Sequence, residues 1–454
     1  MENTKQTTGD GMKWFTRTKM MIAGIALVVA LVIAGSATGF YFLGHHHGEQ
    51  DARGRQEYRV VEADVHHIYM TFGTLPTLFA SLHMLTHNHP TYALFTRRDT
   101  FNISAMPDHI QLVRPLFAYG NVPNADIITA AYEVIRDIEA YNDEPTFRFF
   151  TDDLRALLPL WAFLRNGIPA ERFHITLLSD GGGSYGVMFN PFLGANGLTQ
   201  WNARRTSLND TWMPLFKGNA NLSSDQINTI MFSDYGYQVA QMVNAELWLQ
   251  FPEFGFLHPD VTAAVRSELM RTSLVKRQPF DILQQLNTEM REVFFNATLN
   301  NPNHPGGSVR EHLENYLSDP ERPVLIISGT HIGGGVNPND FDDAVYAVMN
   351  AFPDYEIMIK PHPAQDVNAS MFDTTRARGL TILPAQLPME VLMWAFPHVY
   401  IGGYQSSLYM AAVTGQVRFF FSDQWPSGGL GAPNSILHLL NEHGFFHDSI
   451  MINR

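Results

Sequence analysis

Five short segments of the sequence contain residue types that could bind a phosphate group or accept a proton. Four lie in the second half of the chain: Ser328-Gly329-Thr330, Lys360-Pro361-His362-Pro363, Pro388-Met389-Glu390 and Gly402-Gly403-Tyr404-Gln405-Ser406-Ser407. The fifth, Asp180-Gly181-Gly182-Gly183, lies in the first half. Hydroxyl groups, backbone N–H groups and imidazoles bind phosphate, and a carboxylate accepts a proton. The segments therefore predict a site for a phosphorylated ligand and a carboxylate that could act as a general base.

His362 is the most distinctive of these residues because two prolines flank it and fix the backbone on both sides. An imidazole titrates near neutral pH, so at this position it could neutralise or protonate a departing phosphate. The alternative is a structural histidine in a tight turn, and the motif alone favours that alternative. Glu390 opens the predicted helix at 389–396, where a helix cap is favoured over a contact with a ribose diol.

The two remaining segments of the second half also have simple alternatives. Gly329 and Thr330 precede three glycines at 333–335, which would let a ligand approach the backbone closely. The segment matches neither common glycine-rich phosphate motif, and a plain turn fits equally well. Ser406 and Ser407 precede a predicted helix, where free N–H groups bind an anion or a serine caps the helix.

Asp180 follows a predicted strand and precedes three glycines. In such an accessible loop a substrate hydroxyl could reach the carboxylate, which is the placement that a general base needs. An ordinary turn aspartate is the alternative.

Short apolar runs alternate with helical periodicity along most of the chain, as in α/β domains with parallel sheets. The first series predicts a helix at 124–141 and strands at 57–70, 92–96, 146–150 and 173–178. The second series predicts a helix at 342–352 and strands at 323–330, 355–363, 379–384, 398–403 and, last, 417–421. Between Thr211 and Glu321 longer helical segments, including 245–251 and 280–295, predict a crossover. Ligands bind at the carboxyl ends of parallel strands, where the five segments lie.

The composition narrows the class of protein. The chain has 454 residues, of which 45% are hydrophobic, which suffices for an anchor and about two domains. Its formal net charge of −14 argues against sequence-independent binding to nucleic acid. The sequence has no cysteine, so disulfides, a thiolate nucleophile and Cys-ligated zinc are excluded.

Residues 20–43 contain no charge and are long enough to span a bilayer. Lys13, Arg17 and Lys19 precede them, which favours a cytoplasmic N-terminus and thus a single-pass signal-anchor of type II orientation. A cleaved signal peptide is the alternative, but its apolar region is normally shorter. The catalytic part would then lie in a Golgi lumen if the source is a eukaryote, or at the periplasmic face of an inner membrane. The histidines at 45–47 could bind a metal, but a solvated stretch beside the membrane is favoured.

Taken in order, the segments resemble the motifs of the bacterial sialyltransferases of glycosyltransferase family 80. The family has an acidic pair followed by glycine, a His-Pro motif, a Pro-x-Glu element and a Ser-Ser pair. Their counterparts here are Ser179-Asp180-Gly181, Lys360-Pro361-His362-Pro363, Pro388-Met389-Glu390 and Gly402-Gly403-Tyr404-Gln405-Ser406-Ser407. Thr74-Leu75-Pro76-Thr77-Leu78 also looks like the family's first strand-to-helix turn. The resemblance covers about residues 60–430.

The resemblance implies a GT-B fold, in which two Rossmann-like domains face each other across a cleft. It implies an enzyme of glycan biosynthesis that transfers sialic acid from CMP-sialic acid to a galactoside-type acceptor with inversion, without a metal or other cofactor. Asp180 would be the general base, and His362 would stabilise the CMP leaving group. The implied donor-binding residues are Ser406 and Ser407 for the phosphate, Glu390 for the ribose, and Gly329, Thr330, Lys360 and Pro363 for the nucleotide pocket.

The sequence departs from the family at three positions. Ser179 replaces the first acidic residue, His331 stands near where the family carries a tryptophan, and Ser184 replaces a glutamate before Tyr185. Acceptor and linkage therefore stay open. The alternatives are a transferase that uses another CMP- or CDP-activated donor, such as Kdo or an alditol, and an inactive glycan-binding relative.

The predicted organisation has six parts. In order they are a cytoplasmic tail at 1–19, an anchor at 20–43, a stalk at 44–58, an acceptor and base domain at 59–215, a nucleotide-sugar domain at 216–432, and a C-terminal helix at 433–454 that could return to the first domain.

Overall fold

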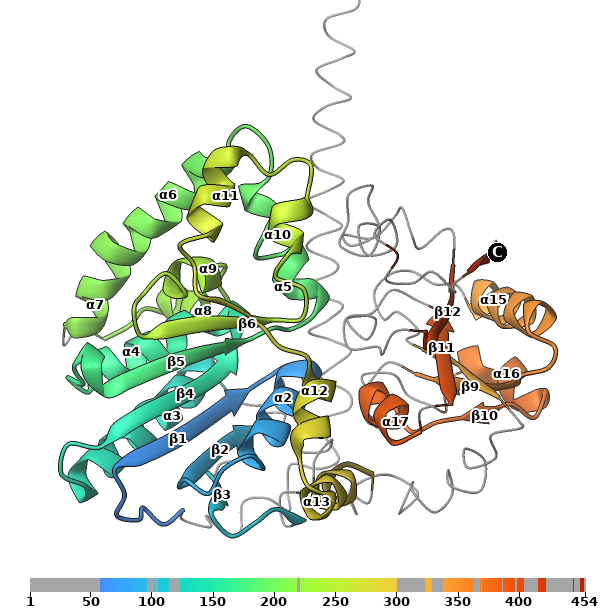
Figure 1. Ribbon diagram of the computed structural model, residues 1–454, viewed down its shortest axis with the longest axis horizontal. Coiled ribbons are helices and arrows are strands. Elements are labelled where there is room, and N and C mark those ends of the chain that lie inside the picture. The colour runs from blue at the N-terminus through green and yellow to red at the C-terminus, as the bar shows by residue number, and fades with distance from the viewer. Residues whose placement is uncertain are drawn as a thin grey trace, which may run out of the picture. The chain divides into compact units, whose positions relative to one another are not determined.

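The structure, a computed structural model, describes two α/β regions of the chain (Figure 1). The described residues are 58–95, 102, 105–113, 123–218, 221–299, 323–328, 338–361, 368, 370–385, 387–396, 398–403, 415–421, 444 and 450–452. The predicted anchor at 20–43 and the histidines at 45–47 lie outside them. Within the described ranges, no helix has the length and apolar character needed to cross a bilayer.

In the described residues, seven parallel strands form the first sheet in the order β3-β2-β1-β4-β5-β6-β7. The strands are β1 (Val65–Thr71), β2 (Thr91–Phe95), β3 (Ile110–Leu112), β4 (Thr146–Asp152), β5 (Phe173–Leu178), β6 (Ala245–Leu249) and β7 (Leu274–Lys276). The strands predicted in the first half are thereby confirmed. The central strands, such as β1, β5 and β6, are buried nearly throughout, which is typical of parallel sheets that helices cover on both faces, whereas the edge strands β3 and β7 are partly exposed.

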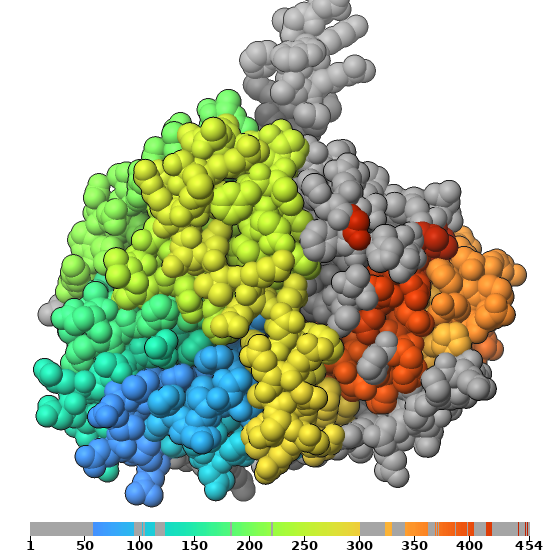
Figure 2. All heavy atoms as spheres, viewed as in Figure 1, coloured from blue at the N-terminus to red at the C-terminus, as the bar shows by residue number. Residues whose placement is uncertain are grey.

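Helices surround this sheet (Figure 1). They are α2 (Thr74–Met84), α3 (Asn124–Tyr141), α4 (Leu157–Arg165), α5 (Gly182–Gly186), α6 (Gly197–Ser207), α7 (Met213–Lys217), α8 (Ser224–Met231), α9 (Gly236–Val239), α10 (Phe254–Leu257), α11 (Ala263–Leu269), α12 (Pro279–Gln285) and α13 (Thr288–Leu299). In α3, buried apolar residues such as Ile127, Ala131, Val134 and Ile138 recur at helical spacing, as predicted. Helices α3, α7 and α8 contact α4, whereas α2 contacts α12. Figure 2 shows the side chains of α12, in yellow, against the blue segment that includes α2.

The segment 245–251 was predicted to be helical, and this prediction was wrong. Ala245–Leu249 is strand β6, which pairs with β5 on one side and β7 on the other. A short apolar run does not reveal by its period whether it is a strand or a helix, and here pairing with distant strands decides. The first sheet therefore continues past residue 215, at which the sequence predicted the first domain to end.

The second sheet has six parallel strands among the described residues, in the order β10-β9-β8-β11-β12-β13. The strands are β8 (Val324–Ser328), β9 (Glu356–Lys360), β10 (Thr381–Ile382), β11 (Val399–Gly403), β12 (Val417–Phe421) and β13 (Ile450–Ile452). The helices are α15 (Pro338–Ala351), α16 (Asp373–Ala377) and α17 (Met389–Ala395). Every strand predicted in this half is confirmed, as is the helix at 342–352.

Strand β13 corrects two predictions about the end of the chain. It follows 417–421, which was predicted to be the last strand, and it occupies part of 433–454, which was predicted to be a helix. Its three residues pair in parallel with the edge of β12. A run this short has no recognisable period, so only the neighbouring strand makes it a strand.

Candidate active site

The order of strands reverses in the first sheet between β1 and β4. The chain leaves β1 toward β2 and β3 on one side, then returns to β4 and continues on the other side. At such a switch point the loops after the strands diverge and leave a crevice in which ligands bind. The residues that follow β1, β4 and β5 at this edge include Gly73, Asp153 and Asp180.

Asp152, the last residue of β4, is fully buried and organises the turn after β1. Its carboxylate accepts hydrogen bonds from the backbone N–H groups of Phe72 at 3.0 Å and Gly73 at 2.8 Å. It also forms an ion pair with Arg155 at 3.3 Å. The Arg155 guanidinium lies 4.2 Å from the centre of the Phe72 ring. These contacts tie the end of β4 to the strand-to-helix turn predicted at Thr74, where α2 begins.

Asp180 lies just past β5 and is half-buried, at the strand end predicted for it. Its carboxyl group packs on the backbone of Gly73, since a Cβ built on Gly73 would overlap Asp180 Oδ1 and come within 2.9 Å of Asp180 Cγ. Only glycine at residue 73 leaves this space. Asp180 therefore lies at the switch point because the loop after β5 and the turn after β1 approach each other closely.

Ser179 and Ser184 order the loop that carries Asp180. The two buried hydroxyls are 2.9 Å apart, and Ser179 Oγ also accepts a hydrogen bond from the N–H of Gly181 at 3.1 Å. Gly181 has φ +62°, in the left-handed region that favours glycine. The two hydroxyls therefore hold the loop that carries Asp180 in place.

Asp153 is a buried carboxyl group that the sequence analysis did not single out. It is completely buried, and neither of its carboxyl oxygens has a hydrogen-bond partner. Burial raises its pKa to about 8, and the charges of Asp180 and Asp152 add to the rise. The Ser184 hydroxyl, which is 2.9 Å from that of Ser179, lies near enough to Asp153 to oppose the rise. Asp153 is therefore neutral at pH 7 beside Asp180. The sequence signal that could have identified Asp153 is the pair Asp152-Asp153, which comes shortly after the strand predicted at 146–150.

In the second sheet, Lys360 and Glu390 lie within electrostatic reach of each other. Lys360 ends β9 and is buried, and its Nζ donates to the carbonyls of Pro361 at 2.5 Å and Ala385 at 2.8 Å. Burial lowers the pKa of Lys360 to about 7, and the Glu390 carboxylate opposes the shift. Glu390 is a buried residue in the first turn of α17. The lysine amine therefore links the segment after β9 to the segment before α17.

The second sheet reverses its strand order between β8 and β11. There Ser328 Oγ donates to the carbonyl of Gly402 at 3.3 Å. Gly403 has φ +117°, and a Cβ on it would lie 3.0 Å from the Ser328 carbonyl oxygen, so this close approach needs glycine. The predicted catalytic residue His362 and the other predicted donor-binding residues, Gly329, Thr330, Pro363, Ser406 and Ser407, lie outside the described residues.

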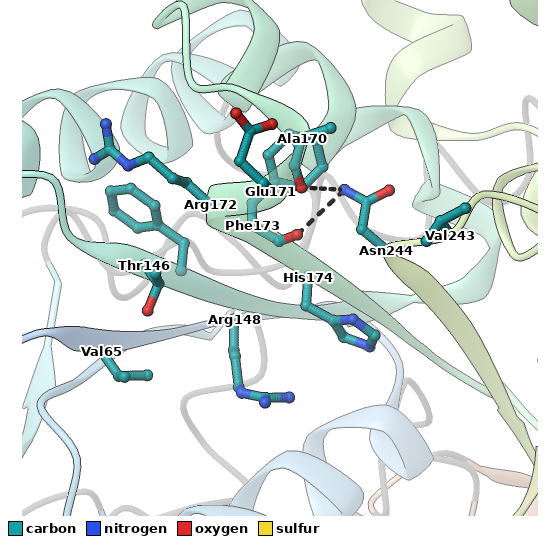
Figure 3. Close-up of a pocket in the computed structure, with 11 residues that line it drawn as sticks. Val65, Thr146, Arg148, Ala170, Glu171, Arg172, Phe173, His174, Val243 and Asn244 are labelled. Atoms are coloured by element: carbon teal, nitrogen blue, oxygen red, sulfur yellow. Dashed lines mark hydrogen bonds between the residues drawn. The ribbon is translucent and has the colours of Figure 1, made fainter.

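A hollow of about 560 Å³ lies at the opposite edge of the first sheet (Figure 3). It is lined by residues at the amino ends of β1, β4 and β5, including Val65, Arg148 and His174. Asn244 closes one side through hydrogen bonds to the carbonyls of Ala170 and Phe173, both at 3.1 Å. None of the predicted site residues lines it, and the switch-point rule favours the carboxyl edge as the active site. Among the described residues, a group that could hold a metal consists of His67, His83 and His87.

Sequence comparison finds no family model and no curated protein that matches the chain. Solved structures do match its fold. An α/β-galactoside α-2,3-sialyltransferase of Photobacterium phosphoreum matches with a TM-score of 0.61 and 14% identity, over 86% of this chain and 98% of its own. A 2,6-sialyltransferase of a Photobacterium species, in complex with the donor product CMP and the acceptor substrate lactose, matches with a TM-score of 0.62 and 15% identity, over 86% and 78%. The GT-B domain of a Photobacterium damselae sialyltransferase matches with a TM-score of 0.61 and 14% identity, over 85% and 99%.

These three proteins are sialyltransferases and hence glycosyltransferases, and the likeness bears out at the level of fold the resemblance inferred from the ordered motifs. The chain therefore has the two-sheet, parallel α/β GT-B fold of the bacterial sialyltransferases.

Proposed function

We propose that this chain is an inverting sialyltransferase that transfers sialic acid from CMP-sialic acid to a galactoside-type acceptor. The observation that carries the proposal is the position of Asp180, whose half-buried carboxyl group packs on Gly73 at the switch point of the first sheet. The fold is that of sialyltransferases, and the matched structure with CMP and lactose supports this choice of donor and acceptor.

In the proposed reaction, Asp180 takes the proton from the acceptor hydroxyl while the hydroxyl oxygen attacks the anomeric carbon of sialic acid. The bond from that carbon to the phosphate oxygen breaks, and CMP leaves with the bonding electrons. Attack from the face opposite the phosphate inverts the anomeric centre. Asp153 stays neutral below about pH 8, so its carboxyl group adds no second negative charge beside Asp180 at neutral pH.

The donor would be held by loops of the second sheet. We assign His362 to stabilise the charge on the departing phosphate, and Ser406 and Ser407 to bind it. Glu390 would bind the ribose hydroxyls, and Gly329, Thr330 and Pro363 would line the nucleotide pocket. Lys360 uses its amine on two backbone carbonyls, so we assign it to positioning the loop that carries His362.

We propose that this transfer needs no metal ion. CMP carries a single phosphate, and a histidine with two hydroxyls and backbone N–H groups suits its charge. Transfer should therefore proceed at the same rate in excess EDTA. A rate that EDTA abolishes and Mg²⁺ or Mn²⁺ restores would contradict metal independence.

The test uses the purified full chain in detergent with CMP-sialic acid and lactose, and in parallel with CMP-Kdo. CMP release and the mass of the product are measured. We expect sialyl-lactose from the first donor, and release of CMP from neither donor would refute the proposal. Product from CMP-Kdo alone would support the alternative donor.

Asp180→Asn tests the base. We expect kcat to fall by about 10²–10⁴-fold, the usual contribution of a general base, while binding of CMP persists. Asp225→Asn is the matched control, because Asp225 is an exposed aspartate in the first turn of α8. Transfer that survives Asp180→Asn would exclude Asp180 as the base.

We also propose that residues 20–43 anchor the chain in a membrane, with its N-terminus in the cytoplasm. The catalytic part would then face a Golgi lumen or the periplasm. The full chain should stay with membranes during alkaline carbonate extraction. Leu31→Arg combined with Val32→Arg should release it, because two charges at the centre of the span oppose insertion. A wild-type chain recovered in the carbonate supernatant would contradict the anchor.

A further inference from the structure

Imidazole rings gather around the hydroxyl group of Tyr69 in the first sheet. Tyr69 is fully buried in β1, and its Oη lies 3.3 Å from His67 Nδ1, 2.7 Å from His83 Nδ1 and 3.0 Å from His87 Nε2. His67 comes from the same strand, His83 from the last turn of α2, and His87 from the loop before β2. Three ring nitrogens from three parts of the fold thus converge on one oxygen.

The spacing of these atoms is close to that of a coordination shell. The three imidazoles can each offer a ligand nitrogen within 4.8 Å of the other two. In a tetrahedral zinc site with Zn–N bonds of about 2.05 Å, neighbouring ligand atoms are roughly 3.3 Å apart. Tyr69 Oη stands at that distance from His67 Nδ1, at 3.3 Å, whereas His83 Nδ1 at 2.7 Å and His87 Nε2 at 3.0 Å would have to move slightly away from it. Rotation of His83 and His87, which are only partly buried, can close the remaining nitrogen separations.

Histidine is a common zinc ligand, and a neutral imidazole can bind the ion through either Nδ1 or Nε2. The spacing His83-x-x-x-His87 is one that zinc sites use.

A hydrogen-bonded cluster without a metal explains part of this arrangement. The Tyr69 hydroxyl can donate once and accept from the N–H groups of the other two rings. The N–H of His89 donates to His87 Nδ1 at 3.3 Å, which leaves the proton of His87 on Nε2, facing Tyr69. A metal at Nε2 would move that proton to Nδ1 and break this long, exposed bond.

Charged side chains near the three histidines affect whether a cation can bind there and which ion it would be. Arg277 and Arg148 both lie near enough to His83 to act on it electrostatically, and Arg148 also pairs with His67 across β1 and β4. Their charges oppose a cation, whereas the nearby Glu246 carboxylate favours one. Ionisation of the Tyr69 phenol on metal binding would supply a compensating negative charge. A His₃Tyr set suits zinc and other divalent ions late in the first transition row, which prefer imidazole to oxygen-only sites.

We propose that His67, His83, His87 and Tyr69 bind one divalent first-row transition-metal ion, zinc by preference, in a closed structural site. The ion would join β1 to the end of α2 and to the loop that leads into β2. His67 lies in the amino-terminal half of β1, whereas Gly73 and Asp180 lie past the carboxyl ends of their strands. The ion is therefore separate from the proposed transfer reaction, and the site stands whether or not the chain transfers sialic acid.

The test measures the metal itself in the full chain. Because the histidines at 45–47 could bind zinc, the starting protein carries His45→Ala, His46→Ala and His47→Ala. It is stripped with a chelator, loaded with zinc or cobalt, and dialysed. We expect about one zinc ion per chain by mass spectrometry, a higher Tm with zinc, and the intense visible bands of tetrahedral cobalt.

Variants identify the ligands. His83→Gln and His87→Gln should each weaken zinc binding by at least about a hundredfold, since even outer-shell changes cost roughly 10–100-fold. Tyr69→Phe keeps the ring that stacks 4.4 Å from Phe150, so it should stay folded while it weakens binding and alters the cobalt bands. His66→Gln is the matched control, because His66 neighbours His67 but bonds to the Ala63 carbonyl instead.

Circular dichroism of each variant shows whether it is folded, so that a loss of zinc binding is not confused with unfolding. A folded starting protein that retains no zinc would refute the site. So would zinc binding that is equal in His83→Gln, His87→Gln and His66→Gln. Unchanged affinity and spectra in folded Tyr69→Phe would remove Tyr69 from the ligand set and overturn the four-ligand site.

Discussion

Substituting alanine for Gly73 would place a methyl group where the carboxyl group of Asp180 now lies. The new Cβ would overlap Asp180 Oδ1 and come within 2.9 Å of both Asp180 Cγ and Pro76 Cδ. The backbone of Gly73, at φ −76° and ψ 158°, is extended and suits alanine. The substitution therefore perturbs Asp180 without straining its own residue.

The size of the effect follows from the displacement. Asp180 must move by about 1 Å to restore ordinary contact, and a misplacement of that size costs on the order of 10²-fold in rate. This corresponds to about 2.7 kcal/mol of activation free energy. Replacing glycine at a compatible backbone stabilises a fold by about 0.4–1 kcal/mol, which offsets part of the steric clash. We therefore expect a large loss of activity with a small change in Tm.

The assay measures kcat/KM for transfer from CMP-sialic acid to lactose, with Tm followed by circular dichroism. Gly218→Ala is the matched control: its backbone is also extended, at φ −78° and ψ 164°, and its Cβ would meet only an ordinary contact at 3.4 Å. Gly73→Ala combined with Asp180→Asn should be no slower than Asp180→Asn alone, because both changes act through one carboxyl group. Wild-type activity in Gly73→Ala, or additive losses in the double variant, would refute the reasoning.

Three further predictions concern the buried ionisable groups. Asp153 has a folded pKa of about 8 against an unfolded value of about 3.9, so it binds a proton only in the folded state between these values, and its contribution to stability falls as pH rises through that window. Asp153→Asn should therefore gain Tm relative to wild type from about pH 4 to pH 8 in calorimetry, and a difference independent of pH would contradict this. Asp152→Ala should lower the free energy of unfolding in urea by about 3–5 kcal/mol, because it leaves Arg155 and two backbone N–H groups without their buried partner. A loss below about 1 kcal/mol would show that these contacts of the Asp152 carboxylate contribute little to stability. Lys360→Met should lower stability by about 1–3 kcal/mol, since the carbonyls of Pro361 and Ala385 lose their donor, and should raise the KM for the CMP donor; unchanged donor KM would separate Lys360 from the donor site.

Several features were predictable because the sequence signal is local. The buried strands β1, β4, β5, β8, β9 and β11 each contain a short apolar stretch, although polar residues such as His66 and Arg148 interrupt β1 and β4, and α3 repeats its apolar residues at helical spacing. Asp180 was placed at a strand end by the same reasoning, since a polar residue and three glycines follow an apolar run. The order of the motifs also predicted the fold that the solved sialyltransferases share.

Other features depend on residues that are distant in the chain, so only the tertiary structure decided them. Ala245–Leu249 is a strand because β5 and β7 flank it, and Ile450–Ile452 is a strand because β12 offers an edge. The high pKa of Asp153 comes from complete burial near Asp180, which no local pattern reveals.

The need for glycine at residue 73 comes from a carboxyl group more than a hundred residues away, and His67, His83 and His87 meet because β1 and α2 pack together. Periodicity along the chain thus determined which elements form and which strand ends carry polar groups. Contacts across the chain determined the environment of Asp180 and the group of histidines around Tyr69, because burial and close approach are properties of the folded arrangement.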